Sequence, residues 1–126
     1  MEDNGYSIIF QSDKYFGKAI KLYRVVGVRE HESIYKNKIF ISGMNSLEGR
    51  QFAFTEKEVI NYAATDKSKI AIAKVTIPEK ILTNLDFSDN IDVNIFTNGV
   101  ITVHPEENEF FIKSIIQIEI KERIWK

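Results

Sequence analysis

Four side chains in this sequence could act together on a ligand that carries phosphates and sugar hydroxyls: Arg24, Thr55, Glu107 and Glu109. Arg24 has a planar guanidinium that can bind two phosphate oxygens at once. Thr55 stands at a predicted strand-to-helix corner, where backbone N–H groups and a hydroxyl suit an anion or a sugar. Glu107 and Glu109 are two residues apart, so a strand would place both carboxylates on one side. A carboxylate in such a place can perform acid–base work or stabilise developing positive charge.

The strand that must position Arg24 is predicted over residues 19–26. Its alternation puts Arg24 in one row with Ile20, Leu22 and Val26. A charge in an apolar row must be paired or must bind something anionic. We expect Arg24 to point into a cleft, with a structural ion pair as the alternative.

A strand running directly into a helix is predicted over residues 49–64. Phe52 and Phe54 alternate with smaller or polar residues, as in a half-buried strand. Thr55 then takes the N-cap position, and Glu58 completes a capping box. Thr55 could contact a ligand or serve only as the cap.

The remaining pattern is mostly β. Strands are expected at 6–10, 39–41 and 70–77, with Pro78 ending the last of these. The Asn98-Gly99 pair predicts a hairpin over 93–103 with a type I′ turn. Alternating isoleucines after Glu109 predict a long strand up to Ile120, whose charged end would blunt a sheet edge. Helical turns are expected at 29–37 and 79–85, and a loop at 42–49. Strands with few helices favour an α+β fold.

Composition narrows the function classes. A chain of 126 residues with 44% hydrophobic residues is expected to be one domain, 1–126. Seventeen basic and eighteen acidic residues give a net charge of −1, which provides no drive toward nucleic acid. The absence of cysteine excludes disulfides, thiolate metal sites and a cysteine nucleophile.

Two further exclusions concern metals and membranes. His31 and His104 are too few for a metal centre, so none is expected and both are predicted to be ordinary surface residues. Apolar runs are too short to cross a membrane, and the acidic start resembles no signal peptide. The expected location is a cytoplasm, either its own or that of a target cell reached by secretion.

Several segments resemble the ADP-ribosyltransferase fold in its small bacterial-toxin form, the Arg-Ser/Thr-Glu class. They are Leu22-Tyr-Arg-Val-Val26, Gly49 to Ala64, Gly99-Val-Ile-Thr-Val103 and Asn108-Glu-Phe-Phe-Ile112. The resemblance implies a split, mixed but mostly antiparallel sheet with one or two short helices. It also implies NAD as substrate: Arg24 and Thr55 would hold the nucleotide, and Glu109 and Glu107 would be catalytic. NAD-consuming toxins of the RES type, which share ancestry with this fold, are a related possibility.

Phe54 and Tyr62, or Phe52, could wall the nicotinamide ring, with plain core packing as the alternative. As an NAD-using toxin or effector, the chain would transfer ADP-ribose to a macromolecule, a protein rather than a nucleic acid, or hydrolyse NAD. A cognate immunity or antitoxin protein is then an expected partner. The competing hypothesis is a non-enzymatic binding or immunity-type module in which Arg24 is structural.

Overall fold

The fold is taken from a computed structural model and is described for residues 5–12, 15, 17–37 and 49–122. Its strands are β1 Ser7–Gln11, β2 Ala19–Val26, β3 Arg50–Ala53, β4 Ala71–Pro78, β5 Asp86–Ser88, β6 Val100–Val103 and β7 Gln117–Glu122. Its helices are α1 Val28–Asn37, α2 Glu56–Ala63 and α3 Asn108–Ser114, with 3₁₀ helices η1 Glu79–Asn84 and η2 Pro105–Glu107. The α+β prediction is confirmed.

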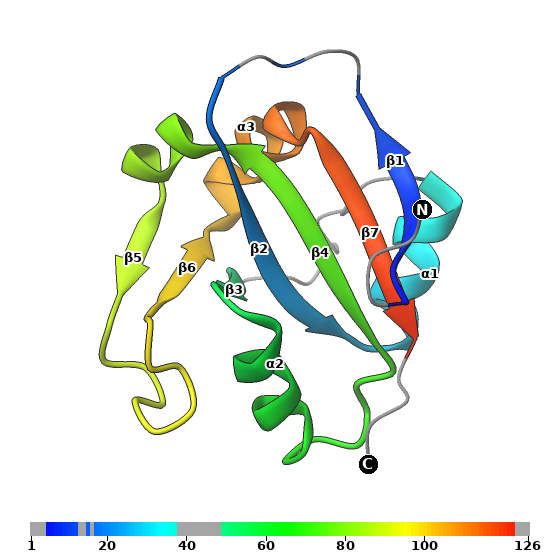
Figure 1. The fold of residues 1–126 in the computed structure, drawn as a ribbon, viewed down its shortest axis with the longest axis vertical. Coiled ribbons are helices and arrows are strands. Elements are labelled where there is room, and N and C mark those ends of the chain that lie inside the picture. Colours follow the sequence, from blue (N-terminus) through cyan, green and yellow to red (C-terminus); the bar gives the residue numbers. More distant parts are fainter. Residues whose placement is uncertain (1–4, 13–14, 16, 38–48, 123–126) are drawn as a thin grey trace.

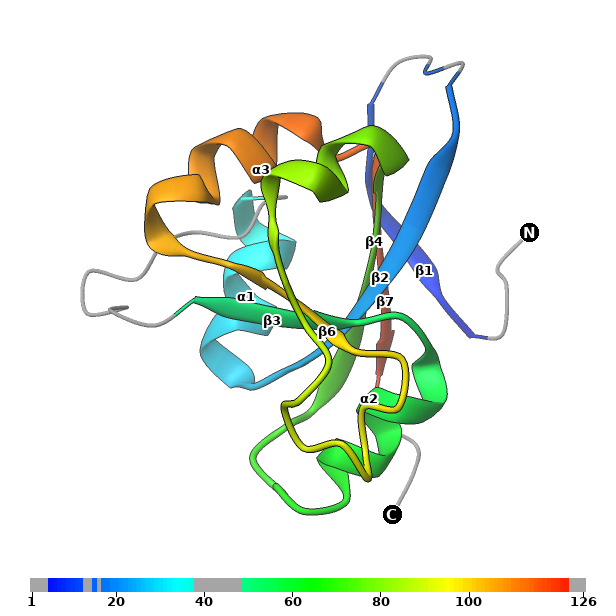
Figure 2. The same cartoon turned by 90° about the vertical axis from the view of Figure 1, so that its left-hand side faces the viewer.

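The strands form an antiparallel sheet in the order β1-β7-β4-β2-β3-β6-β5 (Figure 1). This sheet has two parts that are joined weakly. β2 pairs with β4 along its whole length, but it meets β3 only at Tyr23 and Ala53. Beyond that pair the strands diverge, and Figure 2 shows β3 and β6 crossing steeply over β2, β4 and β7. The sheet is therefore split, and backbone groups of β2 and β3 face the gap.

Helices cover both faces of the larger part of the sheet. Ile34 of α1 and Phe111 of α3 belong to a core cluster with Leu22, Val75 and Ile118. Alternate strand residues face the other way, and α2 packs on them through Val59 and Ala63. β4 is buried at every position because it lies between β7 and β2 and is covered on both sides.

The local predictions around α2 and β4 are confirmed. Thr55 has an extended backbone and its hydroxyl accepts the N–H of Glu58 at 3.3 Å, so it is the N-cap of α2. Pro78 is the last residue of β4, and the turns expected at 29–37 and 79–85 are α1 and η1.

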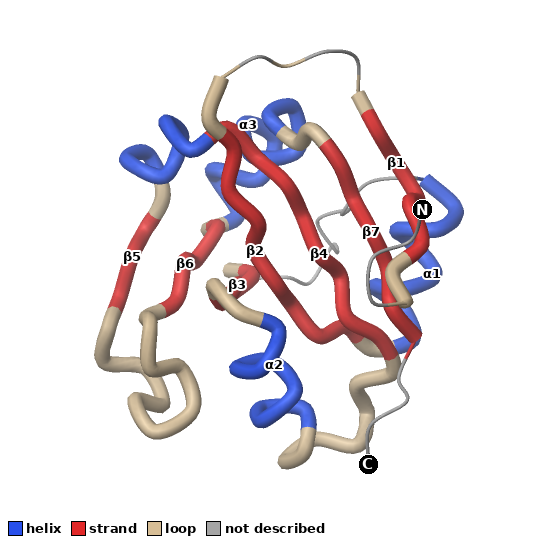
Figure 3. Tube along the Cα trace, viewed as in Figure 1, coloured by secondary structure: helices blue, strands red, loops and turns tan. Residues whose placement is uncertain are grey.

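The long strand predicted from Glu109 is wrong in its first half. Residues 108–114 form α3, and only 117–122 form the strand β7 (Figure 3). Phe111 and Ile115 are buried while Phe110 is 45% exposed, which is the spacing of a helix face. The ring centroids of Phe111 and Phe52 are 5.2 Å apart. This tertiary contact overrides the strand-like alternation of apolar residues in the sequence.

The predicted hairpin over 93–103 is also wrong. β6 pairs with β5 on one side and β3 on the other, while 93–95 and 97–98 form turns. Gly99 has a positive φ of 88°, but Asn98 does not, so no type I′ turn forms there. The N–H of Asn98 instead donates to the Glu58 carboxylate at 2.9 Å.

The edges of the sheet differ from expectation too. The last strand, β7, lies between β1 and β4, so it is not an edge. The strand predicted at 39–41 and the loop at 42–48 lie outside the described residues, as do 123–126.

Candidate functional site

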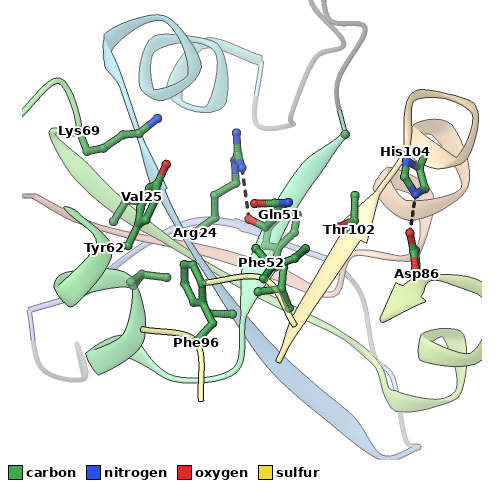
Figure 4. A pocket seen from close by; sticks show the side chains of 15 residues that line it. Arg24, Val25, Gln51, Phe52, Tyr62, Lys69, Asp86, Phe96, Thr102 and His104 are labelled. Carbon is green, nitrogen blue, oxygen red and sulfur yellow. Dashed lines mark hydrogen bonds and ion pairs between the residues drawn. The ribbon is translucent and has the colours of Figure 1, made fainter. Parts of the chain in front are cut away.

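A cavity of about 750 Å³ opens where the two parts of the sheet separate (Figure 4). β2, β3, β5, β6 and α2 all contribute to it. It is lined by Arg24, Val25, Gly49, Gln51, Phe52, Ala53, Val59, Tyr62, Lys69, Asp86, Ile91, Phe96, Val100, Thr102 and His104. A cavity of this size is in the range of small-molecule and cofactor sites.

Strand register explains the polar floor of the cavity. Gln51 pairs with Thr102, and Thr102 pairs with Asp86. Residues paired across antiparallel strands point to the same face, so these three form one row across β3, β6 and β5. The strands are about 4.8 Å apart, which places the backbone of Asp86 roughly 10 Å from that of Gln51. Polar groups thus extend along the floor from one end of the cavity to the other.

Arg24 lies at one end of this row, where β2 and β3 diverge. Its Nε and Nη2 donate to the two Glu30 oxygens at 2.8 and 3.0 Å, and Nη1 donates to the Gln51 carbonyl at 3.2 Å. Three of its five N–H groups donate to these partners, and within the described residues the other two have no partner and can bind a ligand. The third bond crosses the gap between the strands, since Gln51 lies two residues before Ala53, where β3 pairs with β2. Arg24 therefore lines a cavity, as expected, and it also forms the ion pair that was the alternative.

The charge around Arg24 is positive overall. Glu30 is the carboxylate that Arg24 and Arg50 share, with Arg50 Nε at 3.4 Å. Burial lowers the pKa of Arg50, Glu30 opposes that shift, and Arg24 adds to it. Two guanidinium groups against one carboxylate leave one net positive charge here. Lys69 lines the same end of the cavity, but its Nζ lies 4.0 Å from Asp66, so this pair adds no net charge. This end suits an anion.

Aromatic rings form the neighbouring wall. The rings of Tyr62 and Phe96 have centroids 5.6 Å apart and both line the cavity. Phe96 comes from the connection between β5 and β6, and Glu58 holds that connection to α2. The Glu58 carboxylate is buried and accepts from Asn98 N–H at 2.9 Å and from the Thr55 hydroxyl at 2.7 Å.

Glu58→Gln should destabilise the fold by about 1–2 kcal/mol, because an amide N–H₂ would face a hydrogen-bond donor. Burial alone would raise the pKa of Glu58, but hydrogen bonds from Asn98 and Thr55 outweigh it, so the pKa lies below its ordinary value of 4.5. A carboxylate whose pKa is lowered by folding stabilises the fold at pH values above its ordinary pKa. This contribution disappears as the pH falls through the folded-state pKa.

Urea unfolding of wild type and Glu58→Gln at pH 7 and at pH 3 measures this effect. The difference between them should shrink at the lower pH. Glu32→Gln, at an exposed position of α1, serves as the control and should differ little from wild type. A difference that stays constant with pH would show that the charge of Glu58 contributes nothing.

The far end of the polar row holds an acid–imidazole pair. Nε2 of His104 lies 2.8 Å from Oδ2 of Asp86 (Figure 4). This hydrogen bond, and then the negative charge of Asp86, raise the pKa of His104 above its ordinary value. Both side chains are accessible, at 41% for His104 and 54% for Asp86. His104 was expected to be an ordinary surface residue, but it lines the cavity.

Three of the predicted site residues line this cavity: Arg24, Tyr62 and Phe52. Thr55 caps α2 outside it. Phe54 packs beside Phe87, with ring centroids 6.3 Å apart. The expectation that Arg24, Thr55 and Glu109 line one cleft is therefore wrong.

The two predicted catalytic carboxylates also lie outside the cavity lining. The Glu109 side chain is 82% exposed on α3 and pairs with Lys113 at 3.0 Å. Glu107 accepts the backbone N–H of His104 at 3.1 Å and so caps η2. The reason is the helix at 108–114: residues expected to open a strand beside the cleft instead start a surface helix.

The residues that sequence reasoning missed are Asp86, His104, Lys69 and Phe96. Asp86 lies in β5, where the sequence predicts no strand, and nothing in its neighbourhood marks it as functional. His104 was considered only as a possible metal ligand, and the acid that its Nε2 contacts, Asp86, is 18 positions away in sequence. A pair of this kind forms only through the pairing of β5 with β6.

Comparisons with protein-family models, with curated proteins and with solved structures found no match to this chain. Within the part of the chain that the structure describes, no group of three or more His, Asp or Glu side chains could hold a metal ion. Among the same residues, no helix has the length and apolar character needed to cross a bilayer.

Proposed function

We propose that the cavity binds NAD and that the chain consumes it, by transferring ADP-ribose to a macromolecule or by hydrolysing NAD. One observation carries this proposal: a single cavity at the split of the sheet combines a cationic end, an aromatic wall and an accessible carboxylate. These are the groups that a diphosphate, a base and a ribosyl centre respectively require.

The cationic end supports diphosphate binding. Arg24 keeps two N–H groups beyond those used by Glu30 and Gln51. Its guanidinium is already oriented by Glu30, so little conformational freedom is lost when a phosphate binds. The net positive charge that Arg24, Arg50 and Glu30 produce favours an anion over a neutral ligand.

The aromatic wall supports binding of a flat ring. Tyr62 and Phe96 present adjoining rings to the cavity, and a base can stack on such a surface. A cavity of about 750 Å³ is compatible with a ligand that also carries a diphosphate and a sugar.

The chemistry fits these groups. Cleavage of the nicotinamide–ribose bond builds positive charge on the sugar, as glycoside hydrolysis does. A nearby carboxylate stabilises that charge most in the transition state, which is what catalysis requires. Transfer of ADP-ribose would need a macromolecular acceptor, which in our proposal is a protein. Such an activity suits a bacterial toxin or effector, whose partner would be a cognate immunity protein.

A second candidate function is a non-enzymatic binding module. The observation that favours it is the bidentate Arg24–Glu30 pair, which is what a structural arginine would show. The predicted carboxylates Glu107 and Glu109 also lie outside the cavity lining. In this case the cavity would bind an anionic ligand without turnover.

Two measurements on the wild-type chain separate these functions. Calorimetric titration with NAD, ADP-ribose and nicotinamide tests binding, and chromatography of free nicotinamide tests turnover. We expect NAD and ADP-ribose to bind through their shared diphosphate, and nicotinamide to accumulate with time. Binding without release would favour the non-enzymatic module. If neither NAD nor ADP-ribose binds, the proposed NAD-consuming function is overturned.

A further inference from the structure

The Asp86–His104 pair is the feature that the sequence did not predict and that the cavity places opposite its cationic end. The polar row runs from Arg24 past Gln51 and Thr102 to Asp86. If the diphosphate lies at Arg24, a ligand extending along this floor brings its next group, a ribose, to Asp86.

The hydrogen bonds of His104 define its role. Its Nε2 lies 2.8 Å from Asp86, and its side chain also accepts the backbone N–H of Glu107 at the start of η2. With Nε2 facing Asp86, the accepting atom is Nδ1, so the ring proton is on Nε2 and is donated to Asp86. Both ring nitrogens are therefore occupied. His104 is not available as a base; it holds Asp86 in place.

Asp86 remains available for a ligand. Its Oδ2 accepts the hydrogen bond from His104 Nε2–H, and no hydrogen bond of Oδ1 is found among the described residues. The β5–β6 pairing fixes its backbone opposite Thr102, and η2 fixes the ring that orients it. A carboxylate that has one oxygen fixed by a hydrogen bond and the other oxygen accessible can act on a bound substrate.

From this geometry we infer that Asp86 is the catalytic carboxylate for NAD cleavage and that His104 is its positioning residue. The inference rests on the proposed function. Asp86 faces the ribose next to nicotinamide, and the adenine ring stacks on Tyr62 and Phe96 at the other end.

The step balances without a further reactant. The bond between C1′ and the nicotinamide nitrogen breaks, and its electron pair neutralises the charged ring nitrogen. The ribosyl group becomes an oxocarbenium ion, which the negative Asp86 stabilises. Water attacks C1′, and its proton passes to Asp86 and then to solvent. The products are ADP-ribose, nicotinamide and one proton.

Asp86→Asn tests the inference, because it keeps the shape and the acceptor for His104 but removes the charge. We expect NAD affinity to change by less than about threefold and the rate of nicotinamide release to fall about a hundredfold or more. Asp89→Asn is the matched control. It lies three residues further along the chain, is exposed and is outside the cavity lining, so it should behave as wild type.

His104 variants test the positioning role. His104→Ala should lower kcat about tenfold with little change in KM, since one hydrogen bond to a charged group is lost. Added imidazole, or the conservative His104→Gln, should restore part of the rate by returning an N–H donor. A purely structural histidine would not respond to imidazole in this way.

The outcomes separate the two claims. Equal nicotinamide release from wild type and Asp86→Asn, both binding NAD, would overturn the role of Asp86 and leave the proposed function standing. No release from wild type that binds NAD overturns the catalytic inference and the enzymatic function together. Circular dichroism and NAD affinity show whether each variant is folded.

Discussion

Glu119→Gln should destabilise the protein by about 3 kcal/mol or more, because it leaves a buried lysine without its counter-ion. Nζ of Lys74 lies 3.6 Å from Oε1 of Glu119, and the two side chains are only 4% and 10% exposed. The centroid of the Tyr6 ring lies 4.1 Å from the same ammonium, and this cation–π contact would offset only part of the lost ion pair.

The control for this prediction is a second Glu–Lys pair in the same protein. Glu109 and Lys113 are 3.0 Å apart but 82% and 75% exposed. Glu109→Gln should change stability too little to measure reliably, since solvent screens an exposed pair. Urea unfolding at pH 7 compares the two variants.

Replacing the buried pair as a whole should have a much smaller effect. Lys74→Met with Glu119→Leu removes both charges together, so neither is left buried and unpaired. We expect this double variant to be within about 1 kcal/mol of wild type, or more stable. A double variant as unstable as Glu119→Gln would show that the ionic contact itself is required.

Glu30→Gln should cost about 2–3 kcal/mol of stability and raise the affinity for an anionic ligand several-fold. Glu30 bridges two guanidinium groups, Arg24 at 2.8 Å and Arg50 at 3.4 Å, and its side chain is 18% exposed. Without its charge the two arginines repel each other, which lowers stability. The same repulsion, with no competing carboxylate, favours a bound diphosphate, and the amide oxygen of glutamine can still accept a hydrogen bond from Arg24 and keep it oriented.

Both halves of this prediction are measurable with one set of variants. Urea unfolding gives the loss of stability, and calorimetric titration with ADP-ribose gives the affinity. Glu32→Gln on the same helix is the control. A stable Glu30→Gln variant would show that the guanidinium cluster needs no counter-ion, and a lower affinity would show that Glu30 serves binding by orienting Arg24.

Sequence reasoning predicted the local elements that are determined by neighbouring residues. The cap at Thr55, the end of β4 at Pro78 and the apolar row around Arg24 depend on residues a few positions apart. The α+β class followed from the same patterns. Elements determined by distant contacts were predicted wrongly.

The two principal errors have one physical cause. The apolar and polar residues of 108–114 are compatible with the alternation of a strand. However, this segment buries Phe111 against Phe52 as a helix. Asn98-Gly99 has the composition of a tight turn, yet the Glu58 carboxylate binds the Asn98 N–H from 40 positions away. Local propensity cannot include either contact.

The candidate site was predictable only in part for the same reason. Arg24 is noticeable because it interrupts an apolar row within its own strand. Asp86 and His104 are ordinary residues in sequence, and they meet because β5 pairs with β6. The catalytic role predicted for Glu109 depends on a strand that begins at this residue, but the strand begins only at Gln117.

The central claim is that the cationic end of the cavity binds the diphosphate of NAD. The most direct test is calorimetric titration of NAD into wild type, Arg24→Gln and Arg50→Gln. The two variants each remove one guanidinium from the same cluster, but only Arg24 lines the cavity. We predict that Arg24→Gln lowers NAD affinity at least about tenfold, as expected for a lost hydrogen bond to a charged group. Arg50→Gln should lower the affinity less, because it removes one positive charge from the cluster but no group from the cavity lining. Equal affinities of wild type and folded Arg24→Gln, or no binding by wild type, would contradict the claim.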